Sequence, residues 1–388
     1  MLNGTHRYFA QERVVYGKPA GEAVAEEAAA KDAKRVFITT NKSLGGNNGL
    51  AAQVAKALGQ RHAGTYAGIT AHSPRDAVIE GAAQARKAGA DLLVAVGGGS
   101  VIDATKLMQL CLWKNLTNVD QLDEFRGARG VDPSRRPPGM ENAIRMVAVP
   151  TTFSAAEFTY IAGISDTRRK VKEGYGHALF TPQTVVLDPA ATLATPLELL
   201  LSTGMKAVDH AVERLCALQT NPYSDATGGE ALRLLTRALP AIKTKPDDLE
   251  ARLNGQIGMW LSITGAASGI GIGASHAIGH TLGGSYGIPH GITSCLTLPS
   301  VLRWNKPANA DRQRQVSALM GRPDKEAGDL VGDLVKSLGL PARLRDVGIK
   351  REDFHAIAEH TMHDPPVRSN PRPIKGPGDL VEILELAW

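Results

Sequence analysis

Apolar residues recur with two different periods along this chain, and the change of period divides it in two. Up to about residue 190, short apolar runs alternate with Ala-rich stretches of helical periodicity, a pattern typical of βαβ units. Helices are expected at 50–60 and 74–88, between the runs. Strands separated by helix-length segments predict a parallel sheet. The predicted strands are 35–40, 91–96, 146–150 and 184–187.

From Pro196 onward the strand-like runs largely disappear and the apolar positions follow a helical period. The sequence therefore predicts an α/β N-terminal domain, residues 1–190, and an all-α C-terminal domain, residues 191–388. Residues 124–141, rich in Arg, Gly and Pro, are expected to be a surface excursion. The helices expected in the second domain are 197–218, 223–243, 247–268, 270–284, 292–304, 309–320, 325–338 and 351–362.

Length and charge narrow the class of protein. A chain of 388 residues is long enough for two domains, each with its own core. Its 44 basic and 39 acidic side chains leave a net charge of +5 without long runs of one sign. Such a weak and dispersed charge argues against nucleic acid as a partner, and it does not repel an anionic substrate.

Cysteine usage and the absence of targeting signals indicate where the protein works. Cys111, Cys216 and Cys295 are far apart and odd in number, so they form neither a disulfide framework nor a CxxC metal site. No secretory signal precedes the first strand, and no apolar run approaches the roughly 20 residues that cross a bilayer. We therefore expect a cytoplasmic protein without a membrane partner.

Three histidines lie close together in the segment from His276 to His290. His276 and His280 are four residues apart, so a helix places them on one face. The glycines and the proline that follow let the chain turn back and bring His290 towards them. Such a group suits a metal site or a proton-transfer site. A structural pair of histidines explains the HxxxH spacing equally well.

A glycine-rich turn, Gly97-Gly-Gly-Ser100, follows the strand predicted at 91–96 and precedes a helix. Glycines let backbone amides approach a phosphate, and the helix N-terminus adds partial positive charge. The turn is thus a candidate pyrophosphate site, although an ordinary tight turn would have the same sequence. It matches neither the GxGxxG nor the Walker pattern.

Hydroxyl side chains follow the strand predicted at 146–150. Thr151, Thr152 and Ser154 come at the carboxyl edge of the sheet, where open α/β sheets bind ligands. Helix capping or a loop hydrogen bond would also explain them.

Four stretches occur in an order that resembles the iron-containing (group III) alcohol dehydrogenase family, and within it the maleylacetate reductases most closely. The resemblance runs from Arg13 to Pro373. It implies the dehydroquinate synthase-like architecture of that family, with a helical catalytic domain that encloses a cleft. The four stretches are 95–106, 149–159, 202–213 and 276–291.

The resemblance implies a nicotinamide dinucleotide, NADH or NADPH, as cofactor. The cofactor's pyrophosphate would lie at the glycine turn. Its phosphate and nicotinamide ribose would lie near the hydroxyls of Thr151, Thr152 and Ser154. Many NAD-dependent relatives have Asp where this chain has Asn41; a neutral side chain does not repel a 2′-phosphate, so NADPH should be tolerated. The implied cofactor-binding residues are Asn41, Gly98, Gly99, Ser100, Asp103, Thr151, Thr152, Ser154 and Lys170.

The chain departs from the family at Lys206. Metal-dependent members have an aspartate there, four residues before a histidine, and His210, His276 and His290 match the three family histidines. A protonated amine has no lone pair for a metal and repels a divalent cation, so we expect no metal. A three-histidine metal site with Lys206 turned away remains an alternative. A salt bridge from Lys206 to Asp209 or Glu213 would make the lysine structural.

These observations predict an NAD(P)H-dependent oxidoreductase, a homodimer that reduces a small carbonyl substrate. The resemblance favours a carboxylated oxo compound of the maleylacetate kind, from aromatic catabolism, with His280 helping to deliver the proton. A metal-dependent alcohol or aldehyde dehydrogenase is one alternative, and a relative that binds cofactor without turnover is another. The expected catalytic residues are Lys206, His210, His276, His280 and His290.

Overall fold

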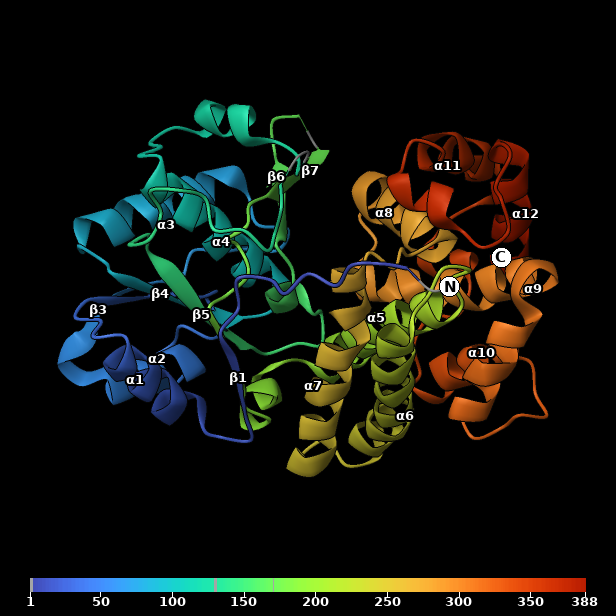
Figure 1. Cartoon of the computed structure of the whole chain (residues 1–388), viewed down its shortest axis with the longest axis horizontal. Helices are drawn as coiled ribbons and strands as arrows, with labels where there is room; N and C mark the ends of the chain where they lie inside the picture. The colour runs from blue at the N-terminus through green and yellow to red at the C-terminus, as the bar shows by residue number, and fades with distance from the viewer. Residues whose placement is uncertain (1–2, 129–130, 170) are drawn as a thin grey trace. The chain divides into compact units, whose positions relative to one another are not determined.

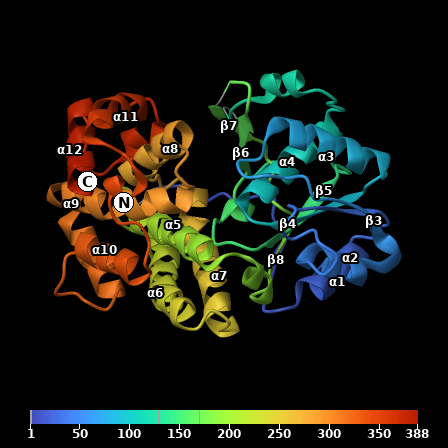
Figure 2. The same cartoon turned by 180° about the vertical axis from the view of Figure 1, so that it is seen from behind.

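The computed structural model describes residues 3–128, 131–169 and 171–388 (Figures 1 and 2). They form two compact units, one from Arg7 to Thr195 and the other from Pro196 to Trp388. The segment before Arg7 belongs to the second unit. There the His6 ring lies edge-on to Tyr223, with ring centroids 4.6 Å apart.

The first unit is built on a six-stranded parallel sheet with the order β1-β8-β5-β4-β2-β3. The four predicted strands and their parallel arrangement are confirmed. Every residue of β2, β4, β5 and β8 is buried, which explains their near-continuous apolar runs. The strands are β1 (Arg13–Tyr16), β2 (Val36–Thr39), β3 (His62–Tyr66), β4 (Leu92–Gly97), β5 (Arg145–Pro150) and β8 (Thr184–Leu187).

Helices cover both faces of this sheet. α1 (Ala20–Ala30) and α2 (Leu50–Leu58) pack together on one face, and α3 (Arg75–Lys87) and α4 (Gly99–Trp113) on the other (Figure 1). Small alanines of α1 and α2 let these helices approach the valines of the strands, so both are part of one apolar core.

A two-stranded antiparallel hairpin, β6 (Ile161–Asp166) and β7 (Val171–Gly176), was not predicted. It is tied to α3 by Arg75, which is only 2% exposed and lies between the carboxylates of Asp166 and Glu173. Arg75 also donates a hydrogen bond of 2.7 Å to the hydroxyl of Tyr175. Buried charge of this kind is tolerated because each group is paired.

In the second unit the described residues form helices and no strand, as predicted. The predicted boundary between 304 and 309 corresponds to a non-helical residue, Asn309, within α9. α12 was not predicted. The helices are α5 (Leu197–Leu215), α6 (Pro222–Thr244), α7 (Leu249–Ile263), α8 (Ala274–Tyr286), α9 (His290–Leu319), α10 (Ala327–Ser337), α11 (Phe354–Thr361) and α12 (Pro377–Ala387).

Short 3₁₀ segments connect the main elements. No helix in the described part of the chain is long and apolar enough to span a membrane. Most of 124–141, as far as it is described, is exposed or half-buried. The 3₁₀ segments are η1 (Gly59–Arg61), η2 (Val119–Phe125), η3 (Ala156–Phe158), η4 (Ala190–Ala194), η5 (Thr264–Ser268), η6 (Leu344–Val347), η7 (Arg351–Asp353) and η8 (Pro365–Ser369).

Candidate functional site

One buried face of α5 carries four ionisable side chains. Lys206 precedes Asp209 and His210 by three and four residues, and Glu213 follows them by four and three, so all four lie on one side of the helix. Each is less than a tenth exposed. Charged residues are rarely buried without a partner, so this face is a candidate site.

The histidines of α8 and α9 join this face and form a row of four imidazoles. The rings of His210 and His276 stack with centroids 4.9 Å apart, and those of His280 and His290 stack at 5.2 Å. His276 and His280, one turn apart on α8, connect the two stacks with centroids 6.3 Å apart. The structure thus brings together the four histidines that the sequence singled out.

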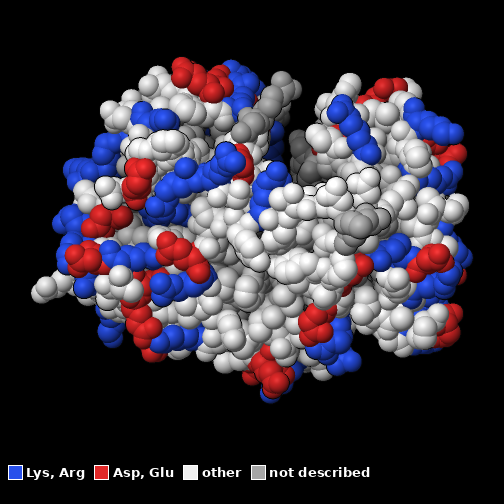
Figure 3. Space-filling view, in the orientation of Figure 1, with Lys and Arg blue, Asp and Glu red and all other residues white. Residues whose placement is uncertain are grey.

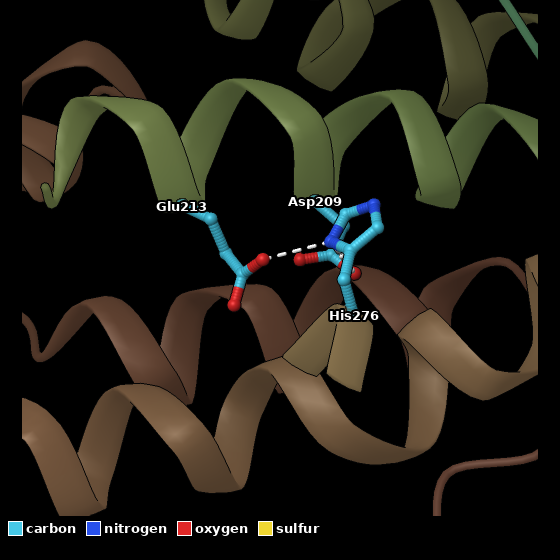
Figure 4. Close-up of side chains that lie close together, drawn as sticks. All are labelled: Asp209, Glu213 and His276. Carbon is cyan, nitrogen blue, oxygen red and sulfur yellow. Dashed lines mark hydrogen bonds and ion pairs between the residues drawn. The ribbon is translucent and has the colours of Figure 1, made fainter. Parts of the chain in front are cut away.

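Glu213 holds His276 in place (Figure 4). The distance between Glu213 Oε2 and His276 Nδ1 is 2.7 Å. The carboxylate also accepts hydrogen bonds of 2.9 Å from the backbone N–H groups of Gly273 and Ser275. His276 Nε2, on the other side of the ring, is buried and has no hydrogen-bond partner among the described residues. A ring that donates Nδ1–H to Glu213 presents a lone pair at Nε2.

Asp209 supports the same arrangement from one turn earlier on α5. Its Oδ2 accepts a hydrogen bond of 2.9 Å from Ser275 Oγ and lies 3.5 Å from His276 Nδ1. Oδ1 has no hydrogen-bond partner in the part of the chain that the structure describes. The sequence analysis considered Asp209 and Glu213 only as ion-pair partners for Lys206 and missed their contacts with α8.

Burial sets the protonation of this cluster. Burial raises the pKa of Asp209 to about 6, although the hydroxyl of Ser294 and the charge of Lys206 act to lower that pKa. Burial and then the charge of Asp209 raise the pKa of Glu213 to about 8. The same burial, followed by the positive charge of Lys206, lowers the pKa of His210 and of His276 well below the ordinary value. Both imidazoles are therefore neutral at neutral pH.

The residues fit a divalent metal only in part. Nδ1 of His210 and Nε2 of His276 have no hydrogen-bond partner among the residues that the structure describes, which suits a metal, but Lys206 places a cation on the same face of α5. A second group of possible metal ligands consists of Asp209, Glu213 and His276, whose ligand atoms lie within 4.8 Å of one another. A metal there would have to displace the Glu213–His276 hydrogen bond. The absence of a metal, which the sequence led us to expect, is not shown.

His280 has a carboxylate partner that the sequence analysis missed. Its Nδ1 lies 2.8 Å from Oδ2 of Asp364, which follows α11. Unlike His276, the His280 side chain is 41% exposed. No local sequence signal marks Asp364, because it meets His280 across 84 residues of chain.

The glycine turn of the first unit closely approaches the hydroxyls that follow β5. A Cβ added to Gly98 would lie 2.9 Å from Thr152 Cγ2, and one added to Gly99 would lie 3.0 Å from Ser154 Oγ. The hydroxyls of Thr152 and Ser154 are buried without a hydrogen-bond partner among the described residues. Backbone N–H groups at the start of α4 and two unsatisfied hydroxyls fit the phosphates of a dinucleotide.

The remaining cofactor candidates have local structural contacts. Asn41 Oδ1 accepts hydrogen bonds from Ser43 Oγ at 2.8 Å and from the N–H of Leu44 at 3.0 Å, which caps the turn after β2. Asp103 Oδ2 accepts from the N–H of Gly163 in β6 at 3.0 Å.

Thr151 is buried, and its carbonyl accepts from Thr195 Oγ1. Ser100 accepts through its carbonyl from Ser73 Oγ. Lys170 lies outside the described residues.

Surface charge does not single out another site. Figure 3 shows basic and acidic side chains interspersed over the visible face of each unit. A groove of about 340 Å³ between α6 and α7 is lined by side chains of both signs, among them Arg233, Arg237, Asp248 and Glu250. None of the candidate residues lines that groove.

Known proteins match both units. Residues 11–189 match the family described as "Iron-containing alcohol dehydrogenase". Residues 200–388 match "Fe-containing alcohol dehydrogenase family, C-terminal".

Three full-length relatives illustrate the range of the match. Dehydrogenase FUM7 of Gibberella moniliformis is 33% identical over 96% of this chain and 95% of its own. The maleylacetate reductase of Burkholderia cepacia is 29% identical over 96% of this chain and 94% of its own. The solved structure of an alcohol dehydrogenase from Oenococcus oeni superposes with a TM-score of 0.86 at 25% identity, and the match covers 100% of both chains.

Proposed function

Because the chain belongs to the iron-containing alcohol dehydrogenase family, whose members are NAD(P)-dependent dehydrogenases and reductases, we propose that it is an NAD(P)H-dependent reductase of a carboxylated oxo compound. Lys206 is the observation that carries this proposal, because it places a buried cation on the face of α5 that also bears His210. The likeness to maleylacetate reductases supports a substrate of the maleylacetate kind, from aromatic catabolism.

The first unit would hold the cofactor. The amides at Gly98, Gly99 and Ser100 would bind its pyrophosphate, and the hydroxyls of Thr152 and Ser154 would complete the site. When bound, the reduced nicotinamide supplies a hydride. Asn41 carries no charge, so either NADH or NADPH is compatible with the turn after β2.

The second unit would act on the substrate. Lys206 would attract the carboxylates and stabilise the negative charge that develops on the carbonyl oxygen during reduction. His280 would give its Nε2 proton to the substrate and recover one from solvent, since it is partly exposed. His210 and His276, both neutral, would line the same row of rings. This division of roles needs no metal.

A metal-dependent alcohol or aldehyde dehydrogenase is the second candidate. It is favoured by the unpartnered nitrogens of His210 and His276 and by the likeness to the Oenococcus oeni alcohol dehydrogenase. A relative that binds cofactor without turnover is the third, because Lys206 departs from the family aspartate.

A single assay separates the three candidates. The purified protein is given NADH or NADPH with a panel of carbonyl compounds, with and without a chelator, and its metal content is measured. We expect turnover of carboxylated oxo compounds that survives chelation. About one metal per chain, with chelator inactivation reversed by that metal, would establish the second candidate. Cofactor binding without turnover on the whole panel would establish the third.

The partners we propose are a small carbonyl substrate and a second copy of the chain. Light scattering of the purified protein should give twice the chain mass of 41.1 kDa. A mass of one chain at all concentrations would remove the dimer from the proposal.

A further inference from the structure

We infer that Asp364 is a positioning residue that fixes the orientation and the tautomer of His280. The inference rests on the proposed function in one respect: it takes His280 as the group that delivers the proton. Its structural part stands on the contact itself, a distance of 2.8 Å between Asp364 Oδ2 and His280 Nδ1.

His280 needs such a partner more than His276 does. Its side chain is 41% exposed, against 2% for His276, so packing alone restricts its rotation less. A ring that flips about its Cβ–Cγ bond places Cδ2 where Nδ1 lay and Cε1 where Nε2 lay, so Nε2 no longer points at the substrate. The bond to Asp364 and the stacking of the His290 ring on the His280 ring both restrict the orientation of the ring.

The segment that carries Asp364 is anchored at both ends to the chain around α8. Before it, Thr361 Oγ1 donates a hydrogen bond of 2.9 Å to Thr281 Oγ1. After it, Ser369 Oγ donates one of 2.6 Å to the carbonyl of Ile272. Asp364 is followed by two prolines, which restrict the backbone of the segment between these anchors. The carboxylate is therefore held in place, and its side chain is only 20% exposed.

A fixed carboxylate at Nδ1 determines which nitrogen exchanges the proton. Asp364 accepts from Nδ1–H, so Nδ1 keeps its proton throughout. A ring that carries protons on both nitrogens gives the proton on Nε2 to the substrate and becomes the neutral Nδ1–H tautomer, from which Asp364 still accepts. Solvent returns a proton to Nε2. One proton leaves the ring and one arrives in each turnover.

The test compares Asp364→Asn with a matched control. Asn keeps the size of Asp, but its amide nitrogen can donate to Nδ1 and so favours the Nε2–H tautomer. We expect kcat to fall by roughly 10²-fold with little change in the substrate KM. Asp364→Glu should recover part of that loss. Glu359→Gln, which removes an exposed α11 carboxylate that pairs with His355 and not with His280, should leave kcat unchanged.

Two further measurements show whether Asp364 acts through His280. In a His280→Gln background, Asp364→Asn should cause no further loss of kcat; independent, multiplying losses would overturn the inference. NMR of the protein labelled with ¹⁵N-histidine should show His280 changing from the Nδ1–H to the Nε2–H tautomer in Asp364→Asn. An unchanged tautomer would also overturn it.

The two proposals fail in different ways. If His280→Gln keeps full activity, the proton role assigned under the proposed function is wrong, while the tautomer change still tests Asp364. If His280→Gln is inactive and Asp364→Asn is fully active, the proton role stands and the positioning role is wrong. Melting curves of both variants exclude loss of fold as the cause.

Discussion

Two carboxylate–imidazole pairs lie within one row of rings, and they differ mainly in burial. Glu213 and His276 approach to 2.7 Å with side chains 5% and 2% exposed. Asp364 and His280 approach to 2.8 Å with side chains 20% and 41% exposed. We therefore expect the same contact to serve two purposes. The buried pair should hold a neutral ring in a fixed place, and the exposed pair should let a ring exchange protons with solvent.

The largest expected effect concerns the stability of the buried pair. Glu213→Ala removes the acceptor of Gly273 N–H, Ser275 N–H and His276 Nδ1–H, and water cannot easily replace it. We expect the free energy of unfolding of the helical unit to fall by about 1–3 kcal/mol for each buried donor left without an acceptor. Asp364→Ala should cost at most about 1 kcal/mol, because His280 can bind water instead.

Urea denaturation and hydrogen exchange of the Gly273 and Ser275 amides would measure that difference. In Glu213→Ala both amides should exchange much faster, whereas in Asp364→Ala they should not. Equal losses of stability in the two variants would mean that burial does not distinguish the pairs.

Next in size is the effect of Lys206 on turnover. Lys206→Met removes the cation and should lower kcat on the order of 10²-fold while the dissociation constant of the cofactor stays the same. Lys206→Asp restores the carboxylate of the metal-dependent relatives beside His210, His276 and His290. Elemental analysis should then find bound zinc or iron.

The outcome for Lys206 also bears on the row of rings. Metal binding by Lys206→Asp would show that the lysine alone prevents a metal from binding at His210, His276 and His290. Near-normal kcat in Lys206→Met, with no metal in Lys206→Asp, would leave Lys206 a structural residue.

A smaller effect is expected from pH. The pKa of His210 and that of His276 are lowered by burial, so below about pH 6.5 the unfolded chain binds more protons than the folded one. Above that pH the two neutral rings do not reduce the free energy of unfolding. Below it, that free energy falls by up to about 1.4 kcal/mol per pH unit for each ring. Asp209 and Glu213, whose pKa values are raised to about 6 and about 8, act in the opposite direction over the same range. Relative to the unchanged protein, the melting temperature of His210→Gln should therefore fall less, or rise more, between pH 7 and 5; superimposable pH profiles would contradict this.

The smallest effect serves as a control in the other unit. Asn41→Asp adds a charge after β2 that should disfavour a 2′-phosphate and shift the preference towards NADH by less than about tenfold. Both imidazole pairs should be unaffected, so kcat with NADH should not change. An unaltered ratio of NADPH to NADH efficiency would remove Asn41 from cofactor selection.

The fold could be predicted where burial is complete. β2, β4, β5 and β8 are buried along their whole length, so their apolar runs were visible in the sequence. β3 reads His-Ala-Gly-Thr-Tyr and is mostly half-exposed, so it has no such run. The hairpin β6–β7 depends on the buried Arg75, a contact between distant segments that no local pattern reveals.

The site could be predicted in part for similar reasons. Helical spacing places His276 with His280, and the glycines and proline that follow bring His290 towards them. The resemblance added His210 and Lys206. The partners of these rings could not be predicted, because Glu213 meets His276 across 63 residues and Asp364 meets His280 across 84. Such contacts follow from how α5, α8 and the segment after α11 pack.

The placement of the first residues bears on how the protein folds during synthesis. Since the segment before Arg7 belongs with Pro196–Trp388, the α/β unit is an insertion within the helical one. The α/β unit emerges complete from the ribosome first and can fold at once. The opening segment must wait until the chain has been made beyond Ser268 before both Tyr223 and Ser268 can contact it. An isolated fragment that starts at Pro196 would lack these contacts, and adding the opening peptide in trans should restore them.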